Sequence, residues 1–441
     1  MSQMRIRPSG PLRGHIRVPG DKSISHRALI LGAIADGASR IENYLPAADC
    51  RATLGAIRAI GVEVEEVSGT SLVIHGRGLR GLQEPSDLVD CVRSGTTMRL
   101  LAGLLAGQPF LSVLGGESQL RRRPMGRIIE PLRLMGATIL GRDGGRLPPL
   151  AVQGGDLHGI DYTLPVASAQ VKSALLLAGL YADSPTTIRE PGPARDHTER
   201  LLGAMGTRLE PGNREVRELR IWPGESLGAL DVEVPGDLSA AAFLVVAAAL
   251  VSGSEIMVEG VGVNPTRAGL LDSLRAMGAA LTVEKRRDVS GEPVADLAVQ
   301  ATELCGVEVD GDTVVRMIDE FPILAVAATQ AQGETLVRDA SELRVKETDR
   351  IATTVAELRR LGAEIEARAD GFVVYGPTPL AGTTVHSHGD HRLAMALAVA
   401  GLVASGETVV QDVACIVDSF PGFEALLRGI ANLPNATGAG P

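Results

Sequence analysis

Short polar phrases, many of them cationic, precede the apolar, helix-like stretches of this chain. Five lie before the first helices of a repeated pattern: residues 21–27, 93–99, 167–172, 319–322 and 389–392. Three lie before second helices: residues 121–124, 195–200 and 346–350. The free N–H groups and the dipole of a helix start attract anions, and Lys and Arg add full charges. The sequence therefore predicts a ligand that carries several phosphate or carboxylate groups.

Single residues in these phrases also have simpler interpretations. Four serines are typical helix N-caps: Ser23, Ser94, Ser168 and Ser239. Arg121 and Arg122 are typical of a solvated surface, and Asp319 is equally typical of an N-cap. The recurrence of charged phrases at the same place in the pattern favours ligand binding.

Other chemistries lose support because their motifs are missing. The sequence has no Walker A loop and no HExxH, and its four Cys show no CxxC spacing. We therefore expect no metal and no cofactor. The net charge of −10 disfavours nucleic acid as a partner.

Composition predicts a globular protein with more than one domain. The 441 residues are 45% hydrophobic and only 2% aromatic, so the core is aliphatic. No apolar run approaches the ~20 residues that span a bilayer, and residues 1–10 lack a signal-peptide segment. We expect a cytoplasmic monomer without a membrane partner.

Two kinds of repeat divide the chain. Val-Pro-Gly-Asp-x-Ser occurs at residues 18–23 and 234–239, each time before an apolar helix. A helix-ending phrase closes on Gly61, Gly136, Gly206, Gly278 and Gly362, with a degenerate sixth copy at Gly429. Glycine there is typical of a left-handed helix terminus. The chain is thus predicted to contain six similar units of roughly 70–80 residues, three in each half.

The fourth unit shows the order of elements within one repeat. It predicts helix 238–251, strand 255–259, helix 265–277, strand 279–283 and strand 297–300. The resulting fold class is α/β, with two similar domains of three βαβαββ units each. Helices would pack beneath mixed sheets, much as in an inverse α/β barrel. A solenoid of the same units is a less favoured alternative.

The repeated Val-Pro-Gly-Asp phrases predict where the chain crosses between domains. One domain would contain residues 1–19 and 237–441, which are the N-terminal strand 5–18 and units four to six. The other would contain residues 20–236, with hinge crossings near 19–20 and 235–237. We expect the ligand to be held between the domains, and residues 432–441 to form a polar tail.

The phrases together resemble the enolpyruvyl transferase family, in the branch that acts on shikimate 3-phosphate. The resemblance covers nearly the whole chain, through residues 21–27, 94–99, 123–125, 168–170, 195–200, 264–267, 346–350 and 389–392. It implies transfer of an enolpyruvyl group from phosphoenolpyruvate to the 5-hydroxyl of shikimate 3-phosphate, with release of phosphate. Two substrates that each bear a phosphate and a carboxylate would explain the many cations.

The resemblance also implies roles for individual residues. Those expected at shikimate 3-phosphate are Lys22, Ser23, Arg27, Ser168, Ala169, Gln170, Arg195, Asp319 and Lys346. Those expected at phosphoenolpyruvate are Lys22, Gly95, Thr96, Arg123, Gln170, Arg350 and Arg392. Asp319 would be the base at the 5-hydroxyl and the acid in elimination, and Glu347 and Lys22 are candidate proton donors to the methylene carbon.

Three departures and two alternatives accompany the resemblance. Arg93, Glu342 and Asp418 stand where many or some relatives have Asn, Asn and Lys, which affects secondary substrate contacts. The other branch of the family acts on a UDP-amino sugar, but it has Asn where Ser23 follows Lys22, and a Cys in a loop where residues 115–118 have none. A non-catalytic sensor of phosphorylated metabolites would need neither Asp319 nor Glu347.

Overall fold

The computed structural model describes residues 2–431, and the chain forms two compact lobes. Lobe 2 contains Gly20–Pro235 and Asp288–Glu292. Lobe 1 contains Pro19 and the residues before it, Gly236–Arg287, and the chain from Pro293 onward. The tail expected at residues 432–441 lies outside the described residues. No helix within residues 2–431 is both long and apolar enough to cross a membrane.

Lobe 2 contains three βαβαββ units. Their elements are β14 (Asp231–Glu233), α1 (Lys22–Ala33), β3 (Ala38–Glu42), α2 (Ala48–Ala59), β4 (Glu63–Glu66), β5 (Leu72–His75); β6 (Val89–Asp90), α3 (Gly95–Ala106), β7 (Leu111–Gly115), η1 (Leu120–Arg122), α4 (Gly126–Leu134), β8 (Thr138–Arg142), η2 (Asp143–Gly145), β9 (Leu147–Gln153); β10 (Asp161–Thr163), α5 (Ala169–Gly179), β11 (Thr186–Arg189), α6 (His197–Ala204), β12 (Leu209–Pro211) and β13 (Glu218–Ile221). The sheet orders are β14-β3-β5-β4, β6-β7-β9-β8 and β10-β11-β13-β12.

Lobe 1 repeats the pattern, except that the sheet of its last unit has three strands rather than four in the described residues. Its elements are β2 (Arg13–Arg17), α7 (Leu238–Leu250), β15 (Glu255–Gly262), α8 (Gly269–Ala276), β16 (Ala280–Val289), β17 (Glu292–Gln300); β18 (Glu308–Val309), α9 (Gly311–Arg316), α10 (Phe321–Gln330), β19 (Gly333–Val337), η3 (Ser341–Val345), α11 (Arg350–Arg360), β20 (Ile365–Arg368), β21 (Gly371–Gly376); β22 (Thr384–His386), α12 (His391–Val403), β23 (Thr408–Gln411), η4 (Val413–Asp418), α13 (Phe423–Ile430) and β1 (Gln3–Ile6). The sheet orders are β16-β17-β15-β2, β18-β19-β21-β20 and β1-β23-β22.

The sheets have the mixed pairing that a βαβαββ unit requires. In the second unit β6 pairs parallel with β7, and β9 pairs antiparallel with β7 and β8. The fifth unit repeats this with β18 parallel to β19, and β21 antiparallel to β19 and β20. A parallel pair needs a crossover, which a helix supplies between β6 and β7, whereas the antiparallel strands β8 and β9 follow one another closely. The predicted α/β fold class is confirmed.

The strand before each Val-Pro-Gly-Asp phrase belongs to a different lobe from the helix after it. β2 pairs parallel with β15 of lobe 1, and α1 then begins lobe 2. β14 pairs parallel with β3 of lobe 2, and α7 then begins the second part of lobe 1. The first unit therefore takes its leading strand from residues 231–233, not from the N-terminal strand that precedes it in sequence.

Two further details differ from the sequence analysis. The N-terminal strand expected at 5–18 is two strands, β1 and β2, because Pro8 and Pro11 between them cannot donate to a sheet. Residues 288–292, expected in the domain with 237–441, belong to lobe 2, where Arg200 Nη1 donates to the Gly291 carbonyl at 2.9 Å.

Five of the six predicted helix-closing glycines have the expected backbone. Gly61, Gly136, Gly206, Gly278 and Gly362 have φ of 87°, 107°, 90°, 89° and 97°. The sixth prediction was wrong, because Gly429 lies inside α13, which ends at Ile430. In the fourth unit the second helix begins at Gly269 rather than 265, because Asn264 Oδ1 accepts from Thr266 N at 2.9 Å and holds a turn.

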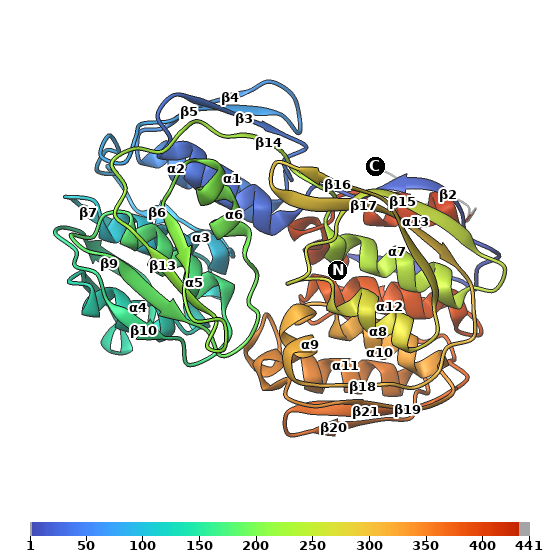
Figure 1. Ribbon diagram of the computed structural model, residues 1–441. Coiled ribbons are helices and arrows are strands. Elements are labelled where there is room, and N and C mark those ends of the chain that lie inside the picture. Colours follow the sequence, from blue (N-terminus) through green and yellow to red (C-terminus); the bar gives the residue numbers. More distant parts are fainter. Residues whose placement is uncertain (1, 432–441) are drawn as a thin grey trace. The chain divides into compact units, whose positions relative to one another are not determined.

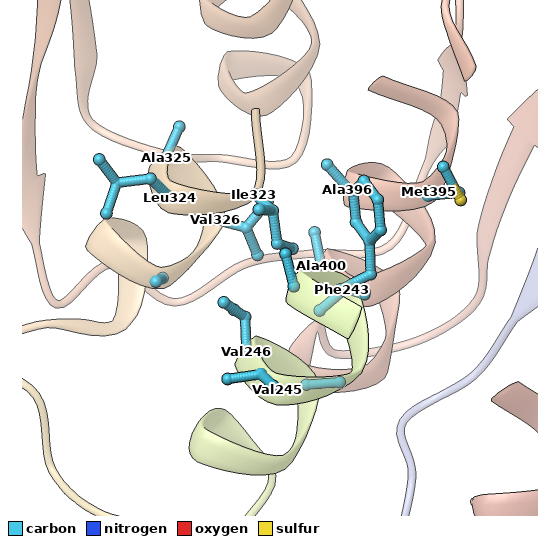
Figure 2. Close-up of a cluster of buried hydrophobic side chains, with 14 of the residues drawn as sticks. Phe243, Val245, Val246, Ile323, Leu324, Ala325, Val326, Met395, Ala396 and Ala400 are labelled. Carbon is cyan, nitrogen blue, oxygen red and sulfur yellow. The ribbon is translucent and has the colours of Figure 1, made fainter. Parts of the chain in front are cut away.

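Each lobe has its own apolar core, enclosed by the sheets, and the first helix of each unit lies in it. Figure 1 shows α7, α10 and α12 inside lobe 1 with the strands outside them. Their side chains, such as Phe243, Val326 and Ala396, meet in one cluster (Figure 2). A helix that is buried on all sides keeps its polar groups at its ends, so the chemistry of these helices lies at their first turns.

Candidate active site

The buried helices of lobe 2 begin with side-chain caps. Ser94 Oγ accepts from Thr97 N at 3.1 Å, and Ser168 Oγ accepts from Val171 N at 3.4 Å. These two serines are therefore N-caps, as their simpler interpretation predicts. Ser23 is not, because Asp21 caps α1 by accepting from Ile24 N at 2.9 Å. Ser23 thus lies in the first turn, with its side chain available for another partner.

Ser239 has the same relation to α7 that Ser23 has to α1. Asp237 is the N-cap, and its Oδ1 accepts from Ser239 N at 2.7 Å. In this second copy, however, Arg267 Nη2 donates to both Asp237 Oδ1 and Ser239 Oγ, at 2.7 and 2.6 Å. The hydroxyl at this corner of lobe 1 is therefore part of a buried internal network.

Arg27 is a buried cation without a carboxylate partner in the described residues. Its Nε donates to Thr198 Oγ1 at 2.7 Å, its Nη2 to Ser173 Oγ at 2.8 Å, and its Nη1 to the Ser23 carbonyl at 3.0 Å. All three acceptors are neutral. Burial lowers the pKa of Arg27 to about 10, although the nearby Glu199 raises it. A desolvated guanidinium of this kind favours an anionic ligand.

Two further cations lie beside the first turn of α1. Arg195 Nη1 donates to Ser23 Oγ at 3.4 Å. Lys22 Nζ lies 3.0 Å from Asp49 Oδ2, and both side chains are mostly shielded from solvent. Asp49 comes from the first turn of α2, so the first and second helices of one unit jointly position Lys22.

Gln170 links the starts of α5 and α3. Its Nε2 donates to Thr96 Oγ1 at 2.9 Å, and its Oε1 accepts from Arg99 Nη1 at 2.5 Å. The two helices can approach because Gly103 has no side chain; a Cβ there would lie 2.2 Å from the Ala174 carbonyl oxygen. Gln170 and Thr96, both predicted from the sequence, are thus brought together by close helix packing.

Gly95 begins α3 against a pair of arginines. A Cβ at this position would lie 3.0 Å from Arg123 Nη1 and 3.1 Å from Arg99 Nη1. Arg123 is half-buried, whereas Arg121 and Arg122 are exposed, as the surface interpretation predicts for those two. The first turn of α3 therefore combines backbone N–H groups with two guanidinium groups, which is an arrangement suited to an anion.

In lobe 1, Arg350 is the centre of a buried carboxylate cluster. Its Nε donates to Asp390 Oδ2 at 2.8 Å, its Nη1 to Asp319 Oδ1 at 3.2 Å, and its Nη2 to Glu347 Oε2 at 2.7 Å. Burial opposes the charge, but Asp390, Glu347 and Asp319 outweigh it and hold the pKa of Arg350 above its ordinary value. Arg350 is therefore permanently cationic.

Arg392 approaches the same cluster from α12. Its Nη2 lies 3.6 Å from Asp319 Oδ2, and its Nη1 lies 3.6 Å from Glu320 Oε1. Asp319 is thus flanked by two guanidinium groups. It is not an N-cap, because Glu320 occupies that position of α10. The simpler interpretation of Asp319 is wrong.

The predicted residues form two groups, one in each lobe. Lobe 2 contains Lys22, Ser23, Arg27, Gly95, Thr96, Arg123, Ser168, Ala169, Gln170 and Arg195, and lobe 1 contains Asp319, Lys346, Glu347, Arg350 and Arg392. Within lobe 2 the contacts described above join Ser23 to Arg27 and Arg195, and Gln170 to Thr96. Within lobe 1 they join Asp319 and Glu347 to Arg350. Lys346 is half-buried at the end of η3.

Several residues that organise these groups received no role from the sequence. Asp49 and Ser173 have no distinguishing local pattern, since each becomes relevant only through a contact from another helix. Thr198 and Asp390 lie in two of the charged phrases, residues 195–200 and 389–392. Asp390 caps α12 by accepting from Arg392 N at 2.9 Å. The sequence could have predicted Asp390 as an N-cap. It could not have predicted the second partner of Asp390, because Arg350 lies 40 residues away in sequence.

The three departures occupy unrelated places. Arg93 Nε lies 3.6 Å from Glu117 Oε2, which gives this cation a carboxylate partner beside the start of α3. Glu342 lies in the first turn of η3, and Asp418 is buried at the end of η4.

Comparison with known proteins decides the family. Residues 6–427 match the family described as EPSP synthase (3-phosphoshikimate 1-carboxyvinyltransferase). The chain belongs to the EPSP synthase family. Curated relatives named 3-phosphoshikimate 1-carboxyvinyltransferase include one from Geobacter sp. (strain M21), 53% identical over 98% of this chain and 99% of the relative. Another, from Desulforudis audaxviator, is 52% identical over 97% and 99%.

Solved structures agree with this membership. The EPSP synthase from Acinetobacter baumannii has a TM-score of 0.86 and 42% identity, covering 98% of this chain and 97% of that one. Because the match to the EPSP synthase family runs from residue 6 to residue 427, it includes every predicted site residue in both lobes. The relatives carry the name of the shikimate branch, which disfavours the UDP-amino sugar branch.

Proposed function

We propose that this chain transfers the enolpyruvyl group of phosphoenolpyruvate to the 5-hydroxyl of shikimate 3-phosphate and releases phosphate. The observation that carries the proposal is the buried Arg27 guanidinium, whose acceptors in the described residues are all neutral. Such a group stabilises an anion strongly because little solvent competes for it. Ser23 and Arg27 are assigned to the carboxylate of shikimate 3-phosphate.

The remaining binding roles follow the family pattern. The phosphate of shikimate 3-phosphate is assigned to Ser168, Ala169, Gln170, Arg195 and Lys346. Phosphoenolpyruvate is assigned to Lys22, Gly95, Thr96, Arg123, Gln170, Arg350 and Arg392. Support comes from the helix starts: Gly95 and Thr96 offer backbone N–H groups beside Arg123, and Gln170 bonds to Thr96.

Asp319 is proposed as the base. Its oxygens face Arg350 and Arg392, at 3.2 and 3.6 Å, and the two cations favour the ionised carboxylate. A carboxylate accepts up to about four hydrogen bonds, so it can accept from a substrate hydroxyl as well as from guanidinium groups. In the addition step Asp319 takes the proton of the 5-hydroxyl. The oxygen of that hydroxyl bonds to C2 of phosphoenolpyruvate, and the methylene carbon gains a proton.

The elimination step reverses these transfers. The tetrahedral adduct returns a proton from its methyl group to the residue that supplied it, and Asp319 gives its proton to the departing phosphate. Glu347 and Lys22 remain the candidates for the methyl proton. The bond from Arg350 Nη2 to Glu347 Oε2 favours the ionised carboxylate, whereas the pairing of Lys22 with Asp49 favours a protonated amine. This difference supports Lys22 as the donor.

Phosphate release tests the activity directly. The purified chain is mixed with phosphoenolpyruvate and shikimate 3-phosphate, and a UDP-amino sugar serves as the control acceptor. Release only with shikimate 3-phosphate is the expected result. Release only with the UDP-amino sugar, or binding without release, would contradict the proposal.

The proposal extends to the state in which the protein works. We also propose that the chain acts on these two small molecules as a monomer in the cytoplasm. Light scattering during gel filtration tests the monomer, and a stable dimer would contradict it.

A further inference from the structure

Lys172 is a buried cation to which no role has yet been given. It lies on α5, and its side chain is 2% exposed. Its Nζ lies 2.8 Å from Glu190 Oε1 and 2.6 Å from Glu199 Oε1, and it donates to the Ala194 carbonyl at 3.3 Å. Three acceptors match the three N–H donors of an ammonium group.

The three acceptors lie along one short segment, residues 190–199. Glu190 directly follows β11, and Glu199 lies in the first turn of α6. The carbonyl of Ala194 is bonded to the nitrogen of Arg195. One ammonium group on α5 therefore holds both ends and the middle of the segment that carries Arg195.

The same segment reaches Arg27. Thr198, next to Glu199, accepts from Arg27 Nε at 2.7 Å, and Ser173, next to Lys172, accepts from Arg27 Nη2 at 2.8 Å. Ser173 Oγ and Thr198 Oγ1 are 2.7 Å apart. A shift of residues 190–199 relative to α5 would separate the two oxygens that orient Arg27.

The charges favour a fixed arrangement. Burial alone would lower the pKa of Lys172, but Glu199 and Glu190 outweigh it and raise the pKa above its ordinary value. Within residues 2–431, Glu190 Oε2 and Glu199 Oε2 are buried and have no hydrogen-bond partner. The two carboxylates therefore depend on this ammonium for compensation, and the group is costly to rearrange.

We propose that Lys172 is a positioning residue for shikimate 3-phosphate. It holds residues 190–199 so that Arg195 is placed for the phosphate and Thr198 orients Arg27 for the carboxylate. The inference rests on the proposed function, and it predicts that loss of Lys172 weakens one substrate selectively. Binding of phosphoenolpyruvate should change less, because Gly95 and Thr96 lie in the first turn of α3 and not in residues 190–199.

The test compares Lys172→Met and Lys172→Arg with a matched control, Lys285→Met. Lys285 is exposed and lies on β16 of lobe 1. Lys172→Met should raise KM for shikimate 3-phosphate about tenfold or more, because small misplacements of a binding group are costly. KM for phosphoenolpyruvate should stay within about twofold. Lys172→Arg should recover part of the loss, and Lys285→Met should match the wild type.

A purely structural role gives a different pattern. Fewer folded molecules would lower the apparent kcat and leave both KM values unchanged, and a general distortion would raise both equally; either result overturns the inference. If Lys172→Met does not fold, Lys172→Met/Glu190→Gln removes one of the stranded charges and should show the same selective rise.

Calorimetric binding of shikimate 3-phosphate alone separates this inference from the proposed function. A wild-type chain that binds it but releases no phosphate would contradict only the reaction. In that case weaker binding by the Met variant supports the positioning role, and unchanged affinity overturns it. A wild-type chain with no affinity for it overturns both.

Discussion

Asp390 Oδ2 lies 2.8 Å from Arg350 Nε, and both side chains are fully buried. The same carboxylate caps α12, because its Oδ1 accepts from Arg392 N at 2.9 Å. Burial would raise the pKa of Asp390, but Arg350 outweighs this effect and lowers it. One buried carboxylate thus fixes both the helix start that carries Arg392 and the guanidinium that contacts Asp319.

Asp390→Asn should destabilise lobe 1 by about 3 kcal/mol, because it leaves a buried guanidinium less compensated. Asn is itself a good N-cap, so the loss reports the charge rather than the cap. Urea unfolding followed by far-UV circular dichroism measures the change. The control Glu366→Gln breaks an exposed pair with Arg368 and should cost less than about 1 kcal/mol. Equal losses of unfolding free energy in the two variants would contradict the inference that Asp390 holds the buried Arg350 and the start of α12 in place.

Asp319→Asn should lower kcat by about 10²–10⁴-fold, because the amide cannot take the hydroxyl proton. Both KM values should change little, since an amide still accepts from Arg350. Steady-state kinetics with each substrate varied in turn provide the measurement. Asp161→Asn, at an exposed residue paired with Arg189, is the matched control and should behave as the wild type. Unchanged turnover in Asp319→Asn would remove this residue from the reaction.

Gly95→Ala should raise KM for phosphoenolpyruvate about tenfold, because the new methyl group would displace Arg123 or Arg99 from the first turn of α3. KM for shikimate 3-phosphate should stay close to the wild-type value. Gly55→Ala is the control: Gly55 lies in α2 with no atom within 4 Å of its Cβ position. Gly55→Ala should leave the kinetics unchanged and raise the free energy of unfolding by about 0.5–1 kcal/mol. A larger effect on shikimate 3-phosphate would refute the assignment of Gly95.

A buried hydrogen-bond chain fixes the state of His26. Its Nδ1 lies 2.6 Å from Thr53 Oγ1, which lies 2.6 Å from Thr97 Oγ1. Thr97 gives its only hydroxyl proton to Ser94 Oγ, at 2.7 Å, or to the Asp49 carbonyl. Thr97 must therefore accept from Thr53, and Thr53 from His26, so Nδ1 carries the proton of a neutral ring.

Burial lowers the pKa of His26 to about 3, which predicts a loss of stability in acid. Between about pH 6.5 and pH 3 the unfolded chain binds a proton that the folded chain does not, so stability falls as the pH falls. From pH 7 to pH 5, the wild type should lose about 2 kcal/mol more than His26→Asn, whose amide keeps the donor to Thr53. The single Trp, Trp222, reports unfolding of lobe 2 by fluorescence. Equal losses of stability in the wild type and in His26→Asn would contradict a buried, neutral His26 ring.

Local sequence features were enough to predict the repeats and the ends of five helices: α2, α4, α6, α8 and α11. The closing glycines work because a left-handed residue is needed after a helix whatever packs around it, and five of six predictions were right. Gly429 failed because α13 continues past it, so the backbone there stays helical. The residue roles came from motif resemblance, and they remain proposals for the experiments above.

By itself, the sequence determined the alternation of helices and strands within the repeats, the family and the charged helix starts, because these depend on residues close together in the chain. Only the tertiary structure decided that β14 rather than the N-terminal strand leads the first unit, that Asp49 pairs with Lys22, and that Lys172 ties Ala194 to α5. These contacts join segments far apart in sequence, and strand pairing and buried charge compensation select among partners only once the helices have packed.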